Sequence, residues 1–218
     1  MRITLPSGTE AELVTPSTDT EIGLVIIPDI FGLRPLFDDL AARLANEWSM
    51  TTCVVEPFPG LDLGEEIESR YAAVPNLDDE ANLRDLLEGA DATGCEKVVL
   101  LGFCMGGMYA YKAVRNDRFA KIASFYGIIR LPEIWAGPGQ GEPLDMISTD
   151  NSDRLLAIIG GLDHFTPDGD VEALDATGAT LVRYPEAEHG FAHDADRPAH
   201  RPDDAADAFA RARKWLTV

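Results

Sequence analysis

Residues 98–107 read Val-Val-Leu-Leu-Gly-Phe-Cys-Met-Gly-Gly, which predicts a buried strand, a sharp turn and a helix that begins near Met105. The turn has the pattern Gly-x-nucleophile-x-Gly, with Cys104 at the position where a serine is more usual. Glycines allow strand and helix to pack closely around a strained residue, and a helix N-terminus favours negative charge on a thiolate or an oxyanion. Cys104 is therefore the candidate nucleophile. The alternative is a free cysteine that packs as a small hydrophobic side chain.

The composition indicates one globular domain spanning residues 1–218, because 45% of the residues are hydrophobic. The formal net charge of −20 offers no basic surface to nucleic acid, and an anionic membrane surface would repel the protein. The sequence has no apolar stretch of membrane-spanning length and begins without a signal-like apolar run. Three widely spaced cysteines, Cys53, Cys95 and Cys104, form neither a disulfide framework nor a zinc pattern. These features predict a cytoplasmic protein in a reducing compartment.

Predicted strands and helices alternate along the chain. Apolar runs predict strands at residues 3–5, 11–14, 23–27, 50–56, 97–101, 122–126, 155–159 and 180–184. Helical spacing of apolar residues predicts helices at 36–48, 77–90, 105–115, 171–177 and 203–216. Residues 61–74 are ambiguous, with a short helix as one possibility, and 131–153 indicate a long loop. With the first two strands as an antiparallel edge, the pattern predicts an α/β fold with a mainly parallel central sheet and helices on both faces.

Two further polar residues follow predicted strands, as Cys104 does. Asp163 follows the strand at 155–159, and His189 follows the strand at 180–184. The chain order nucleophile, acid, histidine is the order of an α/β-hydrolase triad. His189 would take the thiol proton, and Asp163 would orient the imidazole and stabilise its charged form. The alternatives are a turn or cap aspartate and an ordinary loop histidine; neighbouring His164 suits substrate contact or plain exposure better than the role of base.

A second signal precedes the first long predicted helix. Residues 26–32 read Ile-Ile-Pro-Asp-Ile-Phe-Gly, an apolar strand that ends in a turn. Such a turn is where an α/β-hydrolase places one amide of its oxyanion hole. The backbone N–H groups of Ile30 and Met105 are therefore the candidate donors. The alternative is that Asp29 only caps the turn.

At these residues the chain resembles the dienelactone hydrolase family, whose members are carboxymethylenebutenolidase-like enzymes of the α/β-hydrolase superfamily. The resemblance rests on residues 28–32, on 102–107, on Asp163 with Phe165 and Pro167, and on His-Gly-Phe at 189–191. Arg197-Pro198 and the amphipathic C-terminal helix also fit. The resemblance implies a monomer with a Cys-His-Asp triad, no metal or organic cofactor, and a small-molecule ester or lactone as substrate. The archetype opens an unsaturated, carboxylate-bearing lactone to maleylacetate.

The resemblance also implies roles for individual side chains. Asp29, a glutamate in the archetype, would contact the thiol and help to activate it. Two arginines bind the substrate carboxylate in the archetype; His193 occupies the position of one, and Arg70 is a possible counterpart of the other. An acidic protein that lacks one of them is expected to bind an anionic lactone less well. The remaining candidates for substrate contact are Phe31, Phe125, Tyr126, Trp135, His164 and Phe191.

Three functions are compatible with the sequence. The first is hydrolysis of a small ester or lactone through a Cys104 thioester. The second keeps the fold and the triad but acts as a thioesterase or peptidase. The third is a hydrolase-fold protein that binds a ligand without turning it over.

Overall fold

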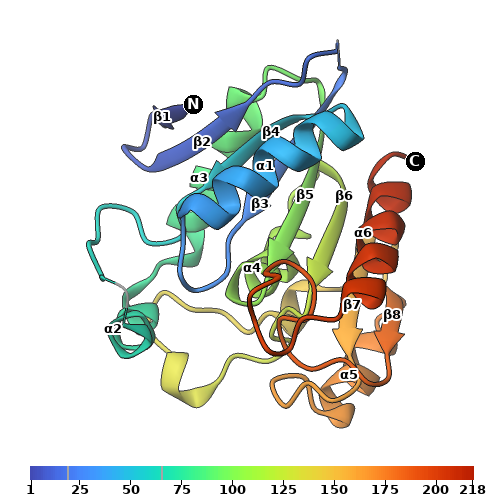
Figure 1. Ribbon diagram of the computed structural model, residues 1–218. Helices are drawn as coiled ribbons and strands as arrows, with labels where there is room; N and C mark the ends of the chain where they lie inside the picture. The colour runs from blue at the N-terminus through green and yellow to red at the C-terminus, as the bar shows by residue number, and fades with distance from the viewer. Residues whose placement is uncertain (19, 65) are drawn as a thin grey trace.

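A single twisted sheet forms the centre of the computed structural model, which describes residues 1–18, 20–64 and 66–218 (Figure 1). Among these residues eight strands occur in the spatial order β1-β2-β4-β3-β5-β6-β7-β8. Their bounds are β1 Arg2–Thr4, β2 Glu10–Val14, β3 Ile22–Ile27, β4 Thr51–Val55, β5 Lys97–Phe103, β6 Phe119–Phe125, β7 Leu155–Gly160 and β8 Thr180–Tyr184. The pairs β1–β2 and β2–β4 are antiparallel, and all other neighbours are parallel. The predicted mainly parallel sheet with an antiparallel edge is confirmed.

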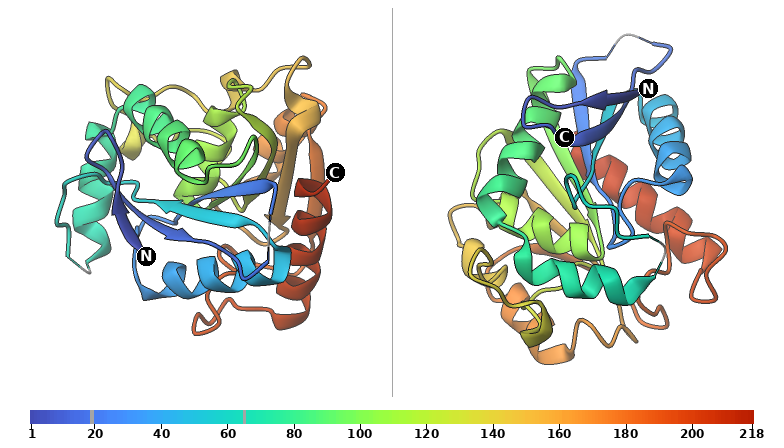
Figure 2. Two further views of the ribbon diagram at one scale, coloured as in Figure 1. Left: turned by 90° about the horizontal axis from the view of Figure 1, so that it is seen from above. Right: turned by 90° about the vertical axis from the view of Figure 1, so that its left-hand side faces the viewer.

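Helices cover both faces of the sheet. The described α-helices are α1 Pro35–Trp48, α2 Ile67–Ala73, α3 Asp79–Ala92, α4 Met105–Ala113, α5 Asp168–Asp175 and α6 Pro202–Leu216. Figure 2 (left) shows α1 and α6 on one side of the sheet and α3 and α4 on the other. No helix in the described ranges is both long and apolar enough to cross a membrane.

The alternation of side chains along the strands explains the two layers. In β5, Val98 and Leu100 pack toward α3, α4 and α5, whereas Val99 and Leu101 pack toward α1 and α6. All four are fully buried, since a parallel strand covered on both faces needs apolar residues at every position. The same requirement accounts for the continuous apolar run that the sequence carries there.

The elements differ from the sequence-based prediction mainly at their ends. Strand β5 continues to Phe103, directly before Cys104, and β6 begins at Phe119 rather than at residue 122. The ambiguous segment 61–74 contains helix α2, with Glu65 lying outside the described residues. The long loop 131–153 contains short 3₁₀ turns at Glu133–Trp135, Leu144–Met146 and Ser152–Arg154. A single turn of 3₁₀ helix is too short to produce a periodic apolar pattern.

Candidate active site

Cys104 occupies a strained turn between β5 and α4. Its backbone angles are φ 56° and ψ −116°, in a region that non-glycine residues rarely adopt. The turn is held by a hydrogen bond from the Cys104 N–H to the Phe125 carbonyl (3.0 Å) and by one from the Met108 N–H to the Cys104 carbonyl (3.0 Å). A Cβ at Gly102 would lie 2.2 Å from the Gly106 oxygen, so only glycine fits there. The predicted strand–turn–helix therefore forms with the thiol at its apex.

His189 and Asp163 meet at the same edge of the sheet, toward which β5, β6 and β7 point in Figure 1. His189 Nδ1 lies 2.8 Å from Asp163 Oδ2. The other oxygen of Asp163 accepts a hydrogen bond from the Phe165 N–H at 2.9 Å, which fixes the carboxylate. The His189 ring also makes edge contacts with Phe165 and Tyr126, at centroid distances of 4.7 and 5.3 Å. The imidazole is thus held both by a carboxylate and by aromatic packing.

The second nitrogen of His189 is left for chemistry. Nε2 is buried and has no hydrogen-bond partner among residues 1–18, 20–64 and 66–218. Burial by itself would lower the pKa of His189, but the negative charge that Cys104 can carry and the contact with Asp163 outweigh it and raise the pKa to about 10. A proton released by the thiol would therefore stay on His189.

The two candidate oxyanion donors are present as unpaired amides. Ile30 and Met105 are both buried, with 3% and 0% exposure. Within the described part of the chain, neither backbone N–H donates to another backbone group. Met105 begins helix α4, where a backbone N–H has no intrahelical acceptor, whereas a buried loop N–H such as that of Ile30 is almost always paired. Two such donors beside the Cys104 thiol have the arrangement that an oxyanion hole requires.

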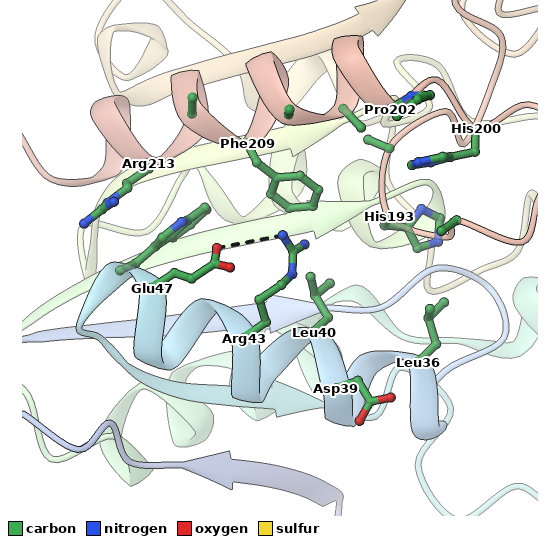
Figure 3. Close-up of a pocket in the computed structure, with 16 residues that line it drawn as sticks. Leu36, Asp39, Leu40, Arg43, Glu47, His193, His200, Pro202, Phe209 and Arg213 are labelled. Atoms are coloured by element: carbon green, nitrogen blue, oxygen red, sulfur yellow. Dashed lines mark ion pairs between the residues drawn. The ribbon is translucent and has the colours of Figure 1, made fainter.

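A pocket of about 60 Å³ opens over the thiol. It is lined by Asp29, Ile30, Phe31, Ile67, Tyr71, Cys104, Ile128, Trp135, Phe165, His189 and Arg197. A larger hollow of about 720 Å³ lies between α1 and α6 (Figure 3), but neither Cys104 nor His189 lines it. We take the small pocket as the candidate site because Cys104 and His189 both line it.

Two of the residues expected to contact substrate, Phe31 and Trp135, line this pocket. The aromatic residues Phe125, Tyr126 and Phe191 instead lie fully buried in the core layer below α1 and α6. They therefore support the site from behind without facing the pocket.

The three basic residues among those candidates also lie outside the pocket lining. His164 is exposed and stacks on Phe165. Arg70 donates to the carbonyl oxygens of Ile30 (3.1 Å) and Gly64 (2.8 Å), which ties helix α2 to the turn after β3. The His193 side chain has 0% exposure.

Both carboxylate oxygens of Asp29 are hydrogen-bonded. Its Oδ1 accepts from the Phe31 N–H (3.0 Å) and from Arg34 Nη1 (2.6 Å), and its Oδ2 lies 2.9 Å from Arg34 Nη2 and 2.8 Å from His193 Nε2. Burial alone would raise the pKa of Asp29, but the contacts with His193 and Arg34 hold it well below its usual range. No hydrogen bond between Asp29 and Cys104 occurs among the described residues.

Arg197 and Arg34 were not among the predicted site residues. Arg197 lines the pocket, and a Cβ at Gly190 would lie 2.6 Å from its Nη1, so the glycine after His189 makes room for the guanidinium. Arg197 forms no ion pair with a carboxylate of the described residues. Only the short block Arg197-Pro198 marked this residue in the sequence. No pattern marked Arg34, whose role depends on the fold of the turn.

No cluster of three or more His, Cys, Asp or Glu side chains in the described ranges could hold a metal ion.

The strand order, the elbow and the positions of Cys104, Asp163 and His189 define an α/β-hydrolase fold. A solved structure of a provisionally assigned dienelactone hydrolase from Klebsiella pneumoniae subsp. pneumoniae has the same fold, with a TM-score of 0.87 at 24% identity over 100% of this chain and 97% of that chain. The model of the dienelactone hydrolase family matches residues 65–218, and the chain belongs to this family.

Two curated relatives agree with this membership. A protein of Escherichia coli O157:H7, provisionally named carboxymethylenebutenolidase, is 28% identical over 208 residues, or 88% of this chain and 75% of the relative. The carboxymethylenebutenolidase of Rhodococcus opacus is 27% identical over 223 residues, or 93% of this chain and 85% of the relative.

Proposed function

We propose that this protein hydrolyses small esters or lactones through a thioester on Cys104. The observation that carries the proposal is one pocket in which a strained cysteine lies beside a histidine whose far nitrogen is 2.8 Å from a buried aspartate. Family membership supports hydrolysis, and the relatives' names support an ester or lactone as the substrate.

The acylation half-reaction uses the groups in that pocket. The thiol proton passes to His189 Nε2, and the sulfur attacks the carbonyl carbon while the π electrons move to the carbonyl oxygen. The amides of Ile30 and Met105 would stabilise this oxyanion, a contribution of about 10²–10³ in rate for each donor. Collapse expels the alkoxide, which takes the proton from His189. In a lactone the alkoxide stays attached to the acyl chain.

Deacylation repeats the same steps with water. His189 removes a proton from water as the oxygen attacks the thioester carbon, and the oxyanion again binds the two amides. The C–S bond then breaks, the acid is released, and the sulfur and His189 return to their starting state. Asp163 keeps the proton on Nδ1 throughout, so that Nε2 remains the exchanging position.

Arg197 points to the charge of the substrate. A guanidinium that has no carboxylate partner among the described residues, at the wall of a pocket in a protein of net charge −20, would bind a carboxylate of the substrate. The arginine expected at position 193 is absent, and Arg197 reaches the pocket from farther along the same segment. We therefore include small anionic lactones and esters among the substrates.

The test compares wild type with Cys104→Ala on dienelactone and on p-nitrophenyl acetate. Turnover of dienelactone that depends on Cys104 would support the full proposal. Turnover of the acetate alone would keep the mechanism and move the substrate to a neutral ester. Equal turnover by Cys104→Ala would overturn the thioester mechanism. A thiol inert to iodoacetamide together with no turnover would favour a ligand-binding protein.

A further inference from the structure

Three buried polar side chains, Tyr126, His193 and Asp29, form a hydrogen-bonded chain between the end of β6 and the turn after β3. The Tyr126 hydroxyl is in short contact with His193 Nδ1, and His193 Nε2 lies 2.8 Å from Asp29 Oδ2. Tyr126 is fully buried, the side chain of His193 has 0% exposure, and Asp29 has 2%. Figure 3 shows His193 at one end of the hollow between α1 and α6.

The proton positions in this hydrogen-bonded chain of side chains follow from the chemistry of its three members. The ionised Asp29 carboxylate only accepts, so His193 Nε2 must carry the hydrogen and donate it. A neutral imidazole then has an unprotonated Nδ1, which accepts from the Tyr126 hydroxyl. Burial lowers the pKa of His193, and the nearby charges of Arg34 and Arg197 act in the same direction against the contact with Asp29. Every donor in the chain therefore meets an acceptor.

Each end of the chain is fixed to one side of the oxyanion hole. At one end the Asp29 side chain accepts from the Phe31 N–H, and the Asp29 carbonyl accepts from the Gly32 N–H, so the turn closes around Ile30. At the other end Tyr126 follows Phe125, whose carbonyl accepts from the Cys104 N–H. Tyr126 itself is held at φ 40°. The chain thus spans from the elbow to the turn that carries the second amide.

The polar character of this chain is costly where it lies. His193 packs between Phe103 and Phe37, at centroid distances of 5.1 and 5.7 Å. An apolar side chain of similar volume would fill this space without the desolvation of a buried polar network. Packing alone therefore does not account for a histidine at this position.

We propose that Tyr126 and His193 are positioning residues, which hold the Asp29 turn so that the Ile30 amide points at the developing oxyanion. The inference rests on the proposed function, because it assumes an oxyanion formed at Cys104. Loss of these hydrogen bonds lets the Asp29 turn relax and weakens the Ile30 donor. The rate of the chemical step therefore falls while ground-state binding changes little.

The test uses variants that remove the hydrogen bonds of Tyr126 and His193 one or two at a time. His193→Leu removes both hydrogen bonds, Tyr126→Phe removes one, and His193→Gln keeps a donor that can reach Asp29. Phe209→Leu, in the same apolar layer, is the matched packing control. We expect kcat for p-nitrophenyl acetate to fall by about 30–100-fold in His193→Leu and by about 3–10-fold in Tyr126→Phe, with KM within about threefold of wild type. His193→Gln should recover part of the loss, and Phe209→Leu should lower Tm without lowering kcat.

A second readout separates the oxyanion from the nucleophile. Phenyl trifluoromethyl ketone adds the Cys104 sulfur to its carbonyl and leaves an oxyanion, whereas iodoacetamide alkylates the same sulfur without forming one. The affinity of His193→Leu for the ketone should fall in parallel with kcat, and its alkylation rate should stay within about twofold of wild type.

Unchanged kcat and ketone affinity in His193→Leu, with only Tm lowered, would overturn the inference and leave the proposed function standing. A parallel fall in alkylation would overturn it as well, because the chain would then act on the nucleophile. Wild-type protein that neither turns over the ester nor binds the ketone would overturn the proposed function, and this inference with it.

Discussion

Two histidine–carboxylate pairs in the described part of the molecule have the same spacing and different surroundings. Asp163–His189 and Asp29–His193 each join an oxygen and a ring nitrogen at 2.8 Å, and all four side chains are largely buried. They differ in the partner of the second ring nitrogen. In His189 that nitrogen has no hydrogen-bond partner in the described residues, whereas in His193 it accepts a hydrogen bond from the Tyr126 hydroxyl.

The surroundings set the charge of each pair. Burial lowers the pKa of both histidines, but beside Cys104 the balance reverses and the pKa of His189 rises to about 10. Beside Arg34 no such reversal occurs, and the pKa of His193 stays below its ordinary value. A histidine on a carboxylate is thus a base or a structural donor according to what faces its other nitrogen.

The largest contrast is expected between the two histidines themselves. His189→Gln should lower kcat/KM by about 10³–10⁴, because the proton acceptor is lost, and Asp163→Asn should lower it by a similar factor through the wrong tautomer. His193→Gln, the matched change in the other pair, should cost far less. Equal losses of kcat/KM in both pairs, measured on the same ester, would mean that His189 is not the distinct proton acceptor.

The raised pKa of His189 predicts a limit at alkaline pH. Below about pH 10 His189 can hold the thiol proton and return it to the leaving alkoxide. Above that pH the proton is lost, so kcat/KM should fall on an alkaline limb centred near the pKa of His189. A pH–rate profile of wild type should show this limb and that of His189→Gln should lack it. A wild-type limb near the ordinary pKa of histidine, about 6.5, would contradict the assignment.

Asp29 should contribute to stability more than to acid–base chemistry. Asp29→Asn leaves Arg34 without its buried partner, at an expected cost of about 3 kcal/mol in the free energy of unfolding near neutral pH. The folded-state pKa of Asp29 is depressed, so its contribution is present above the unfolded value of about 3.9 and is lost as the pH falls below it. Urea unfolding near pH 7 and near pH 3 should show the gap between variant and wild type narrow in acid. A gap that widens in acid would contradict the depressed pKa.

The smallest of these effects should come from Arg197 and should depend on the substrate. Arg197→Met should lower kcat/KM for dienelactone by about 10–100-fold, mainly through KM, because a carboxylate contact is lost. The same variant should hydrolyse neutral p-nitrophenyl acetate at nearly the wild-type rate. Arg115→Met serves as the comparison, since Arg115 pairs with Glu80 (2.7 Å) beyond the C-terminal end of α4 and does not line the pocket. Equal losses on both substrates would indicate a structural role for Arg197.

The meeting of the candidate residues could be predicted because it follows from the order of the strands along the chain. In a parallel sheet every carboxyl end lies at the same edge, so residues in the first few positions after β5, β7 and β8 are brought near one another. Cys104, Asp163 and His189 are such residues, and the structure places them at one pocket or in direct contact with it. The antiparallel pairing of β1 with β2 was predictable because only a short turn joins them, which leaves no room for a crossover.

The side chains on irregular segments could not be assigned in this way. His193 and Arg197 both lie between β8 and α6, where no periodicity shows which side chain turns inward. The structure buries His193 against Asp29 and brings Arg197 to the pocket. The partnership of Asp29 with Arg34 likewise depends on the path of a single turn, which the sequence does not encode as a pattern.

An acyl group that passes through the Cys104 sulfur can be trapped there. Wild-type protein would be mixed with p-nitrophenyl acetate, quenched in acid within the first turnovers and analysed by peptide mass spectrometry, with Cys95→Ala as the control for a second accessible thiol. We expect a hydroxylamine-sensitive acetyl group on the peptide that contains Cys104, in wild type and in Cys95→Ala. An acetyl group on another residue that forms and decays at the rate of turnover would rule out the Cys104 thioester.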